Sequence, residues 1–571
     1  MCKPNYSLED HLRSGTLQGQ LEANTYDFIV FQQGPSSQKS SGEHLLQYAT
    51  EINRIVRDAH IKVVTYMVWP SKVYYQTFDN SIEYYLMANH AIKGILAPVG
   101  LIWKEVEDDG IFSVYGEDQF HPSLKGSFLS AWVIYHSLFP SEKAYPYHRQ
   151  YKKYLTQTEF DSLVSISGNY LMGESSTRNI YQQAAEAYKN NNFLSFFQKL
   201  LWLDLQLPEN PSVLYNLAAA YTLTGNNEKA VETLQQALWL NAELPFESEE
   251  DFSSLHEMDS YQNMVKWHQE LIEPKKIGVT AWKLEEMDFH PEGITYDAEQ
   301  GTYYIGSVRK GKIIHIKKGG EFEELDLTGK LQSALGMQVH NGRLWICSTP
   351  IPEMMGFEES MQAALLCWDI QSETLLTSYA APHPRAILGD LVVSNSGTVY
   401  ISNSDTKHPV IYQLNDKESV LEVIYDGEND GLISLQGLAL DHTDSYLFFS
   451  DYKYGLFRLE LSTGTIQKID YPYPLKGIDG LSYYHGALIA IHNGLSPHRI
   501  MKYTLNKGLD HIEHAEYLEK ALPEMDEPTL GVVVGDEFYY VANSPWAYYD
   551  ENKNILTEKI SAPIIRKFSL K

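Results

Sequence analysis

Cysteine is scarce in this sequence of 571 residues, which contains only Cys2, Cys347 and Cys367. Three cysteines cannot build a disulfide framework, and a chain this long does not need one because it can bury large hydrophobic cores. Cys347 and Cys367 could pair with each other, but we expect two buried free thiols. At roughly 150 residues per domain, the length predicts three to four folding units.

Basic residues are also few, since 45 Lys and Arg stand against 74 Asp and Glu, for a net charge of −29. So acidic a surface repels phosphate and anionic lipid and tolerates cations such as Ca²⁺, so we expect no nucleic-acid partner. No run of about 18 apolar residues is present, which predicts no membrane span. The N-terminus lacks the basic and apolar parts of a signal peptide. The chain as written is therefore predicted to be cytoplasmic, and a secreted or periplasmic location stays open if the N-terminus is truncated.

Residues 1–145 alternate short apolar runs with helical stretches, and strand–helix alternation of these lengths predicts a parallel α/β sheet. The expected strands are 26–31, 61–67 and 95–99, and the expected helices are 43–59, 82–93 and 124–138.

Residues 146–272 contain only helical patterns, with two segments that align at a spacing of about 34 residues. The second segment carries small and apolar residues where a pair of packed helices needs them, and Gly225 supplies the turn. This pattern resembles tetratricopeptide repeats, which implies a concave groove for a peptide or protein partner. The residues of the second segment are Leu214, Leu217, Ala218, Tyr221, Ala230, Leu234 and Ala237; those of the first are Ala184, Ala187, Phe193, Leu200 and Pro208.

Residues 276–571 are rich in Val, Ile, Tyr and Phe, with turns of Gly, Asp and Asn between short strands. A turn followed by an apolar strand recurs six times, and regular recurrence of four-stranded units of about 50 residues predicts a six-bladed β-propeller. The six repeats begin near 301, 342, 397, 445, 486 and 536.

Polar residues precede several of these repeats, where the inner strand of a propeller blade faces the central channel. They include Glu292, Asp390, Gln436 and Asp479. Carboxylate and amide oxygens that converge on one axis are the ligands Ca²⁺ prefers.

At these positions residues 276–571 resemble the gluconolactonase and regucalcin family of six-bladed propellers. In that family a Glu of a Glu-Gly motif, two Asn residues and an Asp hold one divalent cation, which polarises a lactone carbonyl, and the Asp is the general base. The resemblance implies that Glu292, Gln436 and Asp479 hold Ca²⁺ or another divalent cation, with Asp479 also the base. One family Asn is replaced by Gly389, next to Asp390, which removes an amide ligand.

Three further residues are candidates for contact with the substrate. Asn493 opens a loop at the end of a strand and is a candidate to line the channel mouth. His383 and Arg385 are expected on the channel side of the propeller. For His383 and Arg385 the alternative interpretation is that they are solvated loop residues.

In the first region Asp118 stands three residues before His121, a spacing that lets a carboxylate orient an imidazole base. The block 118–123 and three others resemble the SGNH (GDSL-like) hydrolases, in which a Ser in a Gly-Asp/Asn-Ser block is the nucleophile. No such nucleophile block is present in this sequence, and Ser7 does not substitute for the nucleophile. The Gly expected in the second block of the family corresponds to Asn5, and Gln32 stands where the third block would provide the polar donor to the oxyanion. The domain is thus predicted to be incomplete, through truncation or as a retained scaffold. The other blocks are 6–11, 30–33 and 97–100.

The sequence therefore predicts a multidomain protein: a partial SGNH-like α/β domain (1–145), helical repeats (146–272) and a propeller (276–571). The expected function is metal-assisted hydrolysis of a lactone or sugar ester in the propeller channel. Two alternatives stay open: a non-catalytic binding protein that uses the repeat groove and the propeller, or a carbohydrate esterase whose nucleophile block is missing from this sequence.

Overall fold

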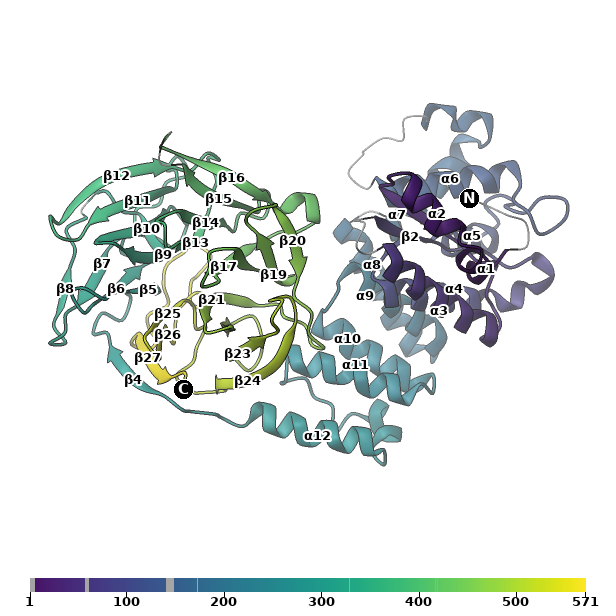
Figure 1. Ribbon diagram of the computed structural model, residues 1–571. Helices are drawn as coiled ribbons and strands as arrows, with labels where there is room; N and C mark the ends of the chain where they lie inside the picture. The colour runs from purple at the N-terminus through teal and green to yellow at the C-terminus, as the bar shows by residue number, and fades with distance from the viewer. Residues whose placement is uncertain are drawn as a thin grey trace. The chain divides into compact units, whose positions relative to one another are not determined.

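The computed structural model describes residues 6–56, 61–139, 148–171, 173–327, 329–415, 417 and 419–571 (Figure 1). The chain divides into two compact units. Unit 1 contains residues 1–237 and 245–262, and unit 2 contains residues 238–244 and 263–571. The expectations for Cys2 and Asn5 lie outside the described residues.

Unit 1 begins with a parallel sheet of three strands in the order β1 (Phe28–Phe31), β2 (Lys62–Tyr66) and β3 (Ile95–Ala97). This confirms the predicted small α/β fold. Strand β2 is central in the sheet, and β1 and β3 are its edges. The accompanying helices are α1 (Leu8–Arg13), α2 (Thr16–Ala23), α3 (Lys39–Val56), α4 (Phe78–Ile92), α5 (Val99–Asp108) and α6 (Leu124–Leu138). Helix α6 has the predicted bounds because the Ser123 side chain accepts the Gly126 N–H at its start. Helix α5, which directly follows β3, was not predicted.

The rest of unit 1 is helical, as predicted. Helix α8 packs on α9, and α9 packs on α10 and on α4. Gly225 adopts a φ of +84°, which lets the chain turn directly between α10 and α11. The predicted contact residues of the second segment are buried. The helices are α7 (Gln157–Leu171), α8 (Gly173–Lys189), α9 (Phe193–Gln206), α10 (Pro211–Leu223), α11 (Asn227–Leu240) and α12 (Asp259–Ile272), the last two ending in unit 2.

Unit 2 is a six-bladed propeller of four-stranded antiparallel sheets (Figure 1). The first strands of consecutive blades contact one another in a closed ring, so they line the central channel. Blades 1 to 3 are β5 (Pro291–Asp297), β6 (Thr302–Ser307), β7 (Ile313–Ile316), β8 (Phe322–Glu324); β9 (Ser333–His340), β10 (Arg343–Thr349), β11 (Ala364–Asp369), β12 (Thr374–Ala380); and β13 (Leu388–Val393), β14 (Val399–Asn403), β15 (Val410–Asn415), β16 (Val420–Asp426). Blades 4 to 6 are β17 (Leu435–Leu440), β18 (Tyr446–Asp451), β19 (Gly455–Glu460), β20 (Thr465–Lys468); β21 (Ile478–Tyr484), β22 (Ala487–His492), β23 (Arg499–Leu505), β24 (Ile512–Lys520); and β25 (Gly531–Val534), β26 (Glu537–Val541), β27 (Ile564–Ser569), β4 (Val279–Lys283).

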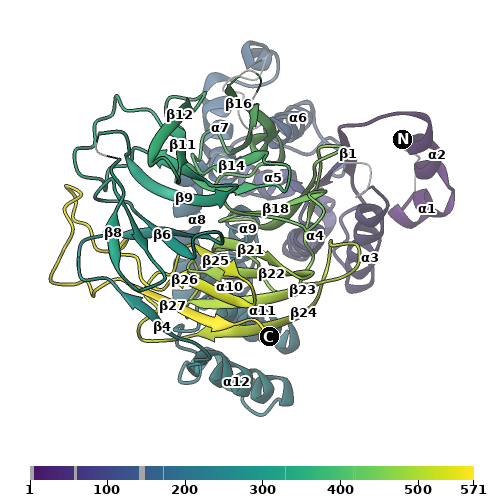
Figure 2. The ribbon, with the colours of Figure 1, turned by 60° about the vertical axis from the view of Figure 1, so that its left-hand side comes forward.

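Strand β4, the first of the propeller in sequence, is the outer strand of blade 6, where it pairs with the C-terminal strand β27 (Figure 2). The two ends of the propeller sequence are thus held in one sheet, and this pairing closes the ring of blades.

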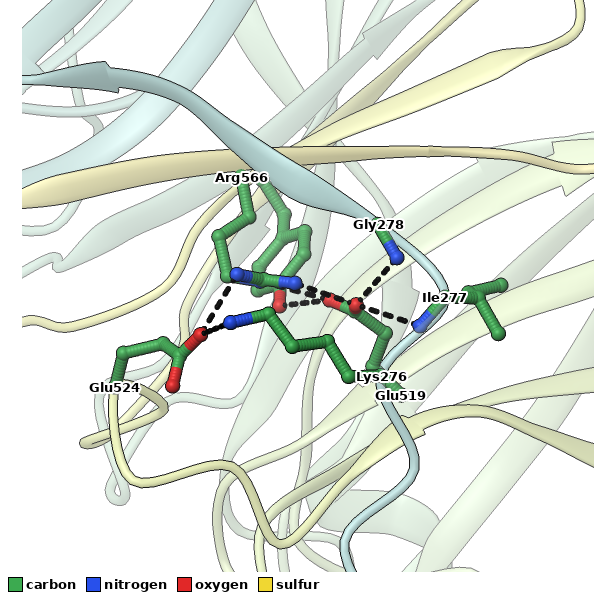
Figure 3. A network of polar contacts seen from close by, with 7 residues as sticks. Lys276, Ile277, Gly278, Glu519, Glu524 and Arg566 are labelled. Atoms are coloured by element: carbon green, nitrogen blue, oxygen red, sulfur yellow. Dashed lines mark hydrogen bonds and ion pairs between the residues drawn. The ribbon is translucent and has the colours of Figure 1, made fainter.

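A buried ion pair next to this closure joins blades 5 and 6 (Figure 3). Glu519 on β24 accepts hydrogen bonds from Arg566 on β27 at 2.7 and 2.9 Å, and from the Tyr540 hydroxyl at 2.6 Å. It also accepts the backbone N–H groups of Ile277 at 3.2 Å and Gly278 at 2.8 Å, where the chain enters β4. Both charged side chains are fully buried. The donors named above replace the water molecules that the Glu519 carboxylate gives up on burial.

Two smaller expectations can be compared with the structure. Cys347 and Cys367 are both buried and are not joined by a disulfide, as predicted. Among the described residues, no helix combines the length and the apolar character that crossing a bilayer requires.

We predict that Arg566→Met lowers the free energy of unfolding by about 3–5 kcal/mol, because it leaves the buried Glu519 carboxylate without its cation. Chemical denaturation of the full chain measures the change. Lys567→Met is the matched control, since Lys567 follows directly on β27 but pairs with Glu537 at the surface, and about 1 kcal/mol or less is expected. Equal losses in the two variants would contradict the structural role of the buried pair.

Candidate functional site

Four inner strands carry the same irregularity at their start. In β5, β13, β17 and β21 the first and fourth residues pair with the second strand of the blade, and the two residues between them do not. These unpaired dipeptides are Glu292-Gly293, Gly389-Asp390, Gln436-Gly437 and Asp479-Gly480. A bulge of this kind redirects a side chain away from the sheet, and here the first residue of each dipeptide faces the channel mouth.

The second position of the bulge is normally glycine because it touches the next blade. A Cβ at Gly293, Gly437 or Gly480 would clash with a backbone carbonyl oxygen of the following blade. Blade 3 has the reverse order. Asp390 occupies the second position, and its carboxylate accepts the Leu438 N–H of blade 4 at 2.9 Å. Gly389 therefore leaves the first position of blade 3 without a side chain.

The bulges surround a cavity of about 380 Å³ at one mouth of the channel. Four residues predicted to bind the cation or the substrate line it, as do Gly389 and Asp390; the four are Glu292, Gln436, Asp479 and Asn493. His383 and Arg385 are not among its lining residues. The sequence analysis missed four others that do line it, namely Glu353, Tyr452, Glu527 and Trp546. The loops that carry these four have no repeated motif, so the sequence offered no signal for them.

The cavity is acidic, and none of the described residues that line it is basic. Burial raises the pKa of Glu292 well above its ordinary value, and the neighbouring Asp479 carboxylate raises it further. Burial also raises the pKa of Asp479 to about 6 and the pKa of Asp390 to about 7. The pKa of Glu527 rises to about 7, through burial first and then through the charge of Asp479. The cavity thus gathers several carboxyl groups, and for Glu292, Asp390, Asp479 and Glu527 the described residues provide no ion pair.

Hydrogen bonds orient the polar side chains of the mouth. The Trp546 indole N–H donates to Glu292 at 2.9 Å, and the Gln436 amide donates to the Ser434 hydroxyl at 2.9 Å. The Asn493 amide donates to Asp479 at 2.7 Å.

The segment between β26 and β27 covers part of the mouth and is tied to blades 1 and 2. The Tyr549 hydroxyl and His290 Nδ1 are 2.7 Å apart, and Lys553 pairs with Glu353 at 2.7 Å. Burial lowers the pKa of His290 to about 3, so this imidazole is neutral. The Trp546 ring packs edge-on against it, with 4.6 Å between the ring centroids. The cover thereby places an aromatic wall beside the carboxylates.

His383 and Arg385 lie in the segment that joins β12 of blade 2 to β13 of blade 3. His383 Nδ1 accepts the Arg385 backbone N–H at 3.3 Å, and its ring lies 3.8 Å from the ring of His408. The loop thus uses His383 for its own geometry.

The donor atoms of the mouth fit a hard divalent cation. They are carboxylate and amide oxygens, the ligand type of Ca²⁺, and they include no thiol and no imidazole. In the described part of the chain, however, no three His, Cys, Asp or Glu side chains already converge closely enough to hold a metal ion. Amide oxygens and water would therefore have to complete the coordination.

In unit 1 the predicted pair is formed but exposed. His121 Nδ1 lies 2.5 Å from Asp118 Oδ2, and the two side chains are 72% and 52% exposed. The hydrogen bond from His121 lowers the pKa of Asp118 to about 2. Within the described residues the hydrogen bond of the His121 ring is to Asp118, and none joins it to a Ser, Thr or Cys side chain. Ser7 caps helix α1, and Gln32 is exposed.

Comparison with solved structures finds proteins with a similar fold. No family model matches the sequence, and no curated protein matches it. The propeller is similar to the calcium-binding protein regucalcin from Agrobacterium tumefaciens, with 14% identity and a TM-score of 0.38 over 51% of this chain and 93% of that one. It is also similar to a gluconolactonase from Xanthomonas campestris, with 14% identity and a TM-score of 0.35 over 52% of this chain and 95% of that one. A third similar structure is virginiamycin B lyase from Staphylococcus aureus, with 13% identity and a TM-score of 0.36 over 52% of this chain and 100% of that one. At these identities the similarity is one of fold.

The raised pKa values predict an unusual pH dependence for the metal-free protein. Asp390, Asp479 and Glu527 hold protons to a higher pH in the folded state than in the unfolded chain. Between about pH 4 and 7 the folded state thus binds more protons, so their contribution to stability falls as the pH rises.

Glu527→Gln should be more stable than the wild type at about pH 7.5, by on the order of 1–3 kcal/mol, with little gain at about pH 4. Glutamine keeps an oxygen that can accept the Ala547 N–H. Urea denaturation in EDTA at the two pH values measures the difference. The same gain at both would contradict the electrostatic explanation.

Proposed function

We propose that the propeller binds a divalent cation, Ca²⁺ by donor type, at the channel mouth and hydrolyses a lactone or sugar ester there. One observation carries the proposal: carboxyl groups from blades 1, 3, 5 and 6 line one cavity, and no basic side chain of the described residues lines it. Buried like charges of this kind are costly unless a cation or protons neutralise them. The cavity volume of about 380 Å³ suits a ligand of monosaccharide size.

In this proposal Glu292, Gln436 and Asp479 hold the cation. A bound Ca²⁺ would supply Lewis acidity toward the carbonyl of the substrate. Asp479 receives the proton of the attacking water, and the Asn493 amide fixes one of its oxygens. The Trp546 indole borders the cavity and excludes water from one side of it. No step is assigned to the Asp118–His121 pair or to the helical repeats.

We expect Ca²⁺ to raise the stability of the full chain, by about 2.7 kcal/mol at a concentration 100 times the dissociation constant. Asp479→Ala should lose most of this effect, because it removes a proposed ligand. Thermal unfolding with EDTA and with Ca²⁺ measures the change.

Glu324→Ala, on the exposed outer strand β8, is the control and should keep the wild-type response. If the wild type responds to neither EDTA nor millimolar Ca²⁺, the hydrolase proposal is wrong. The propeller is then better regarded as a binding module.

Restoring a side chain at Gly389 should strengthen cation binding. A Cβ there would lie 3.7 Å from Gln436 Oε1 and 3.0 Å from the Ser404 hydroxyl, which can rotate away. Gly389→Asn adds an amide oxygen and should lower the dissociation constant for Ca²⁺ by about 3- to 10-fold. Gly389→Ala adds the Cβ without the oxygen and should not. Calorimetric titration with Ca²⁺ distinguishes the two variants. Equal affinities would contradict a bound cation within reach of a side chain at position 389.

A further inference from the structure

Three loops interlock at the rim of the channel beside Asp479. The loop after β18 carries Tyr452, the loop before β21 carries Gly477, and the loop after β22 carries Asn493 and Gly494. The Tyr452 carbonyl accepts the Gly477 N–H at 2.8 Å, and the Gly477 carbonyl accepts the Gly494 N–H at 3.1 Å. The backbone of blade 4 thereby fixes the segment that leads into Asp479 on blade 5.

The glycines at this junction leave room for the Tyr452 ring. A Cβ at Gly494 would lie 2.8 Å from the Tyr452 hydroxyl oxygen and 2.6 Å from the Gly477 Cα. Gly477 itself has a φ of +64°, which disfavours other residues. Any larger residue at 494 would displace the tyrosine. The local sequence is therefore suited to bringing this hydroxyl into the site.

A chain of two hydrogen bonds runs from Tyr452 to the proposed base. The Tyr452 hydroxyl donates to Asn493 Oδ1 at 2.9 Å, and Asn493 Nδ2 donates to Asp479 Oδ2 at 2.7 Å. An amide side chain can rotate by half a turn and exchange its oxygen and nitrogen. With the tyrosine as donor, the oxygen must face Tyr452 and the N–H must face the carboxylate.

We propose that Tyr452 is a positioning residue that acts on Asp479 through Asn493. This inference rests on the proposed function, because it gives Asp479 the role of base. The tyrosine fixes the orientation of the amide, and the amide holds Oδ2 of Asp479. Oδ1 is left as the oxygen that can receive a proton from water or bind a cation.

The kinetic test uses the full chain with Ca²⁺ and glucono-δ-lactone as the probe. Tyr452→Phe should lower kcat about tenfold with KM within about twofold, because it disturbs the orientation of the base and not the binding of substrate. Asn493→Leu should lower kcat at least as much. The double variant should be no slower than Asn493→Leu alone.

Tyr454→Phe is the matched control, because Tyr454 lies on the same loop and does not line the cavity. It should leave kcat and KM unchanged. A raised KM with unchanged kcat in Tyr452→Phe would mean that the hydroxyl contacts the substrate directly, and additive losses in the double variant would mean that it does not act through Asn493. Either result overturns the inference.

A second measurement separates this inference from the proposed function. Thermal unfolding in EDTA of Tyr452→Phe, Asp479→Asn and the double variant needs neither cation nor substrate. If the residues are linked, the double variant should differ from the sum of the single shifts in midpoint by about 1–2 °C. Such coupling supports the link even if the wild type hydrolyses nothing, which would overturn only the proposed function. Additive shifts overturn the inference even if hydrolysis is found.

Discussion

The closure of the propeller is the constraint on which the rest of unit 2 depends. Six blades can present residues to one axis only if the ring is complete, and completion requires β4 and β27, from opposite ends of the propeller sequence, to pair. The fully buried Glu519–Arg566 pair stands at this junction and also binds the backbone that leads into β4. A buried ion pair contributes little net stability, since desolvation offsets its attraction, but it penalises any register that leaves one charge unpaired. We infer that the pair specifies how the ring closes.

The channel mouth depends on the same geometry at a smaller scale. Four of the inner strands begin with a bulge whose second residue touches the next blade, so the spacing between blades determines which residue can stand there. Glycine fits in blades 1, 4 and 5. Asp390 fits in blade 3 because Gly336 of blade 2 leaves room for it, and its carboxylate binds the backbone of blade 4. The exchange converts a position that could face a ligand into a contact between blades, and Asp390 now lies between the mouth cavity and a second cavity further along the channel.

The sequence predicted most of the fold because its repeats are regular. The turn-and-strand pattern gave six blades, and the strand–helix alternation gave the small parallel sheet. It missed α5 because the strand expected at 95–99 overlaps the start of this helix, which begins at Val99 directly after Pro98. Of the site, it found the residues that share the bulge position, Glu292, Gln436 and Asp479. It could not find Tyr452, Glu527 and Trp546, because loops of different length bring them to the mouth, and only the closed ring determines where those loops meet.

The acidity of the mouth connects stability with function. The charges of Asp479 and Glu527 make the ionisation of Glu292 less favourable, and the charge of Asp479 does the same to Glu527. Glu527 also has a φ of +56°, a strained conformation for this residue. Among the described residues no Lys or Arg pairs with these three carboxyl groups, and their repulsion, with the strained backbone at Glu527, reduces the stability of the metal-free protein at neutral pH. A site that only stabilised the fold would have paired these acids with Lys or Arg, as the protein does for Glu353 with Lys553 and for Glu519 with Arg566. The unpaired charge is thus better explained by a ligand that supplies the positive charge than by the needs of the propeller itself.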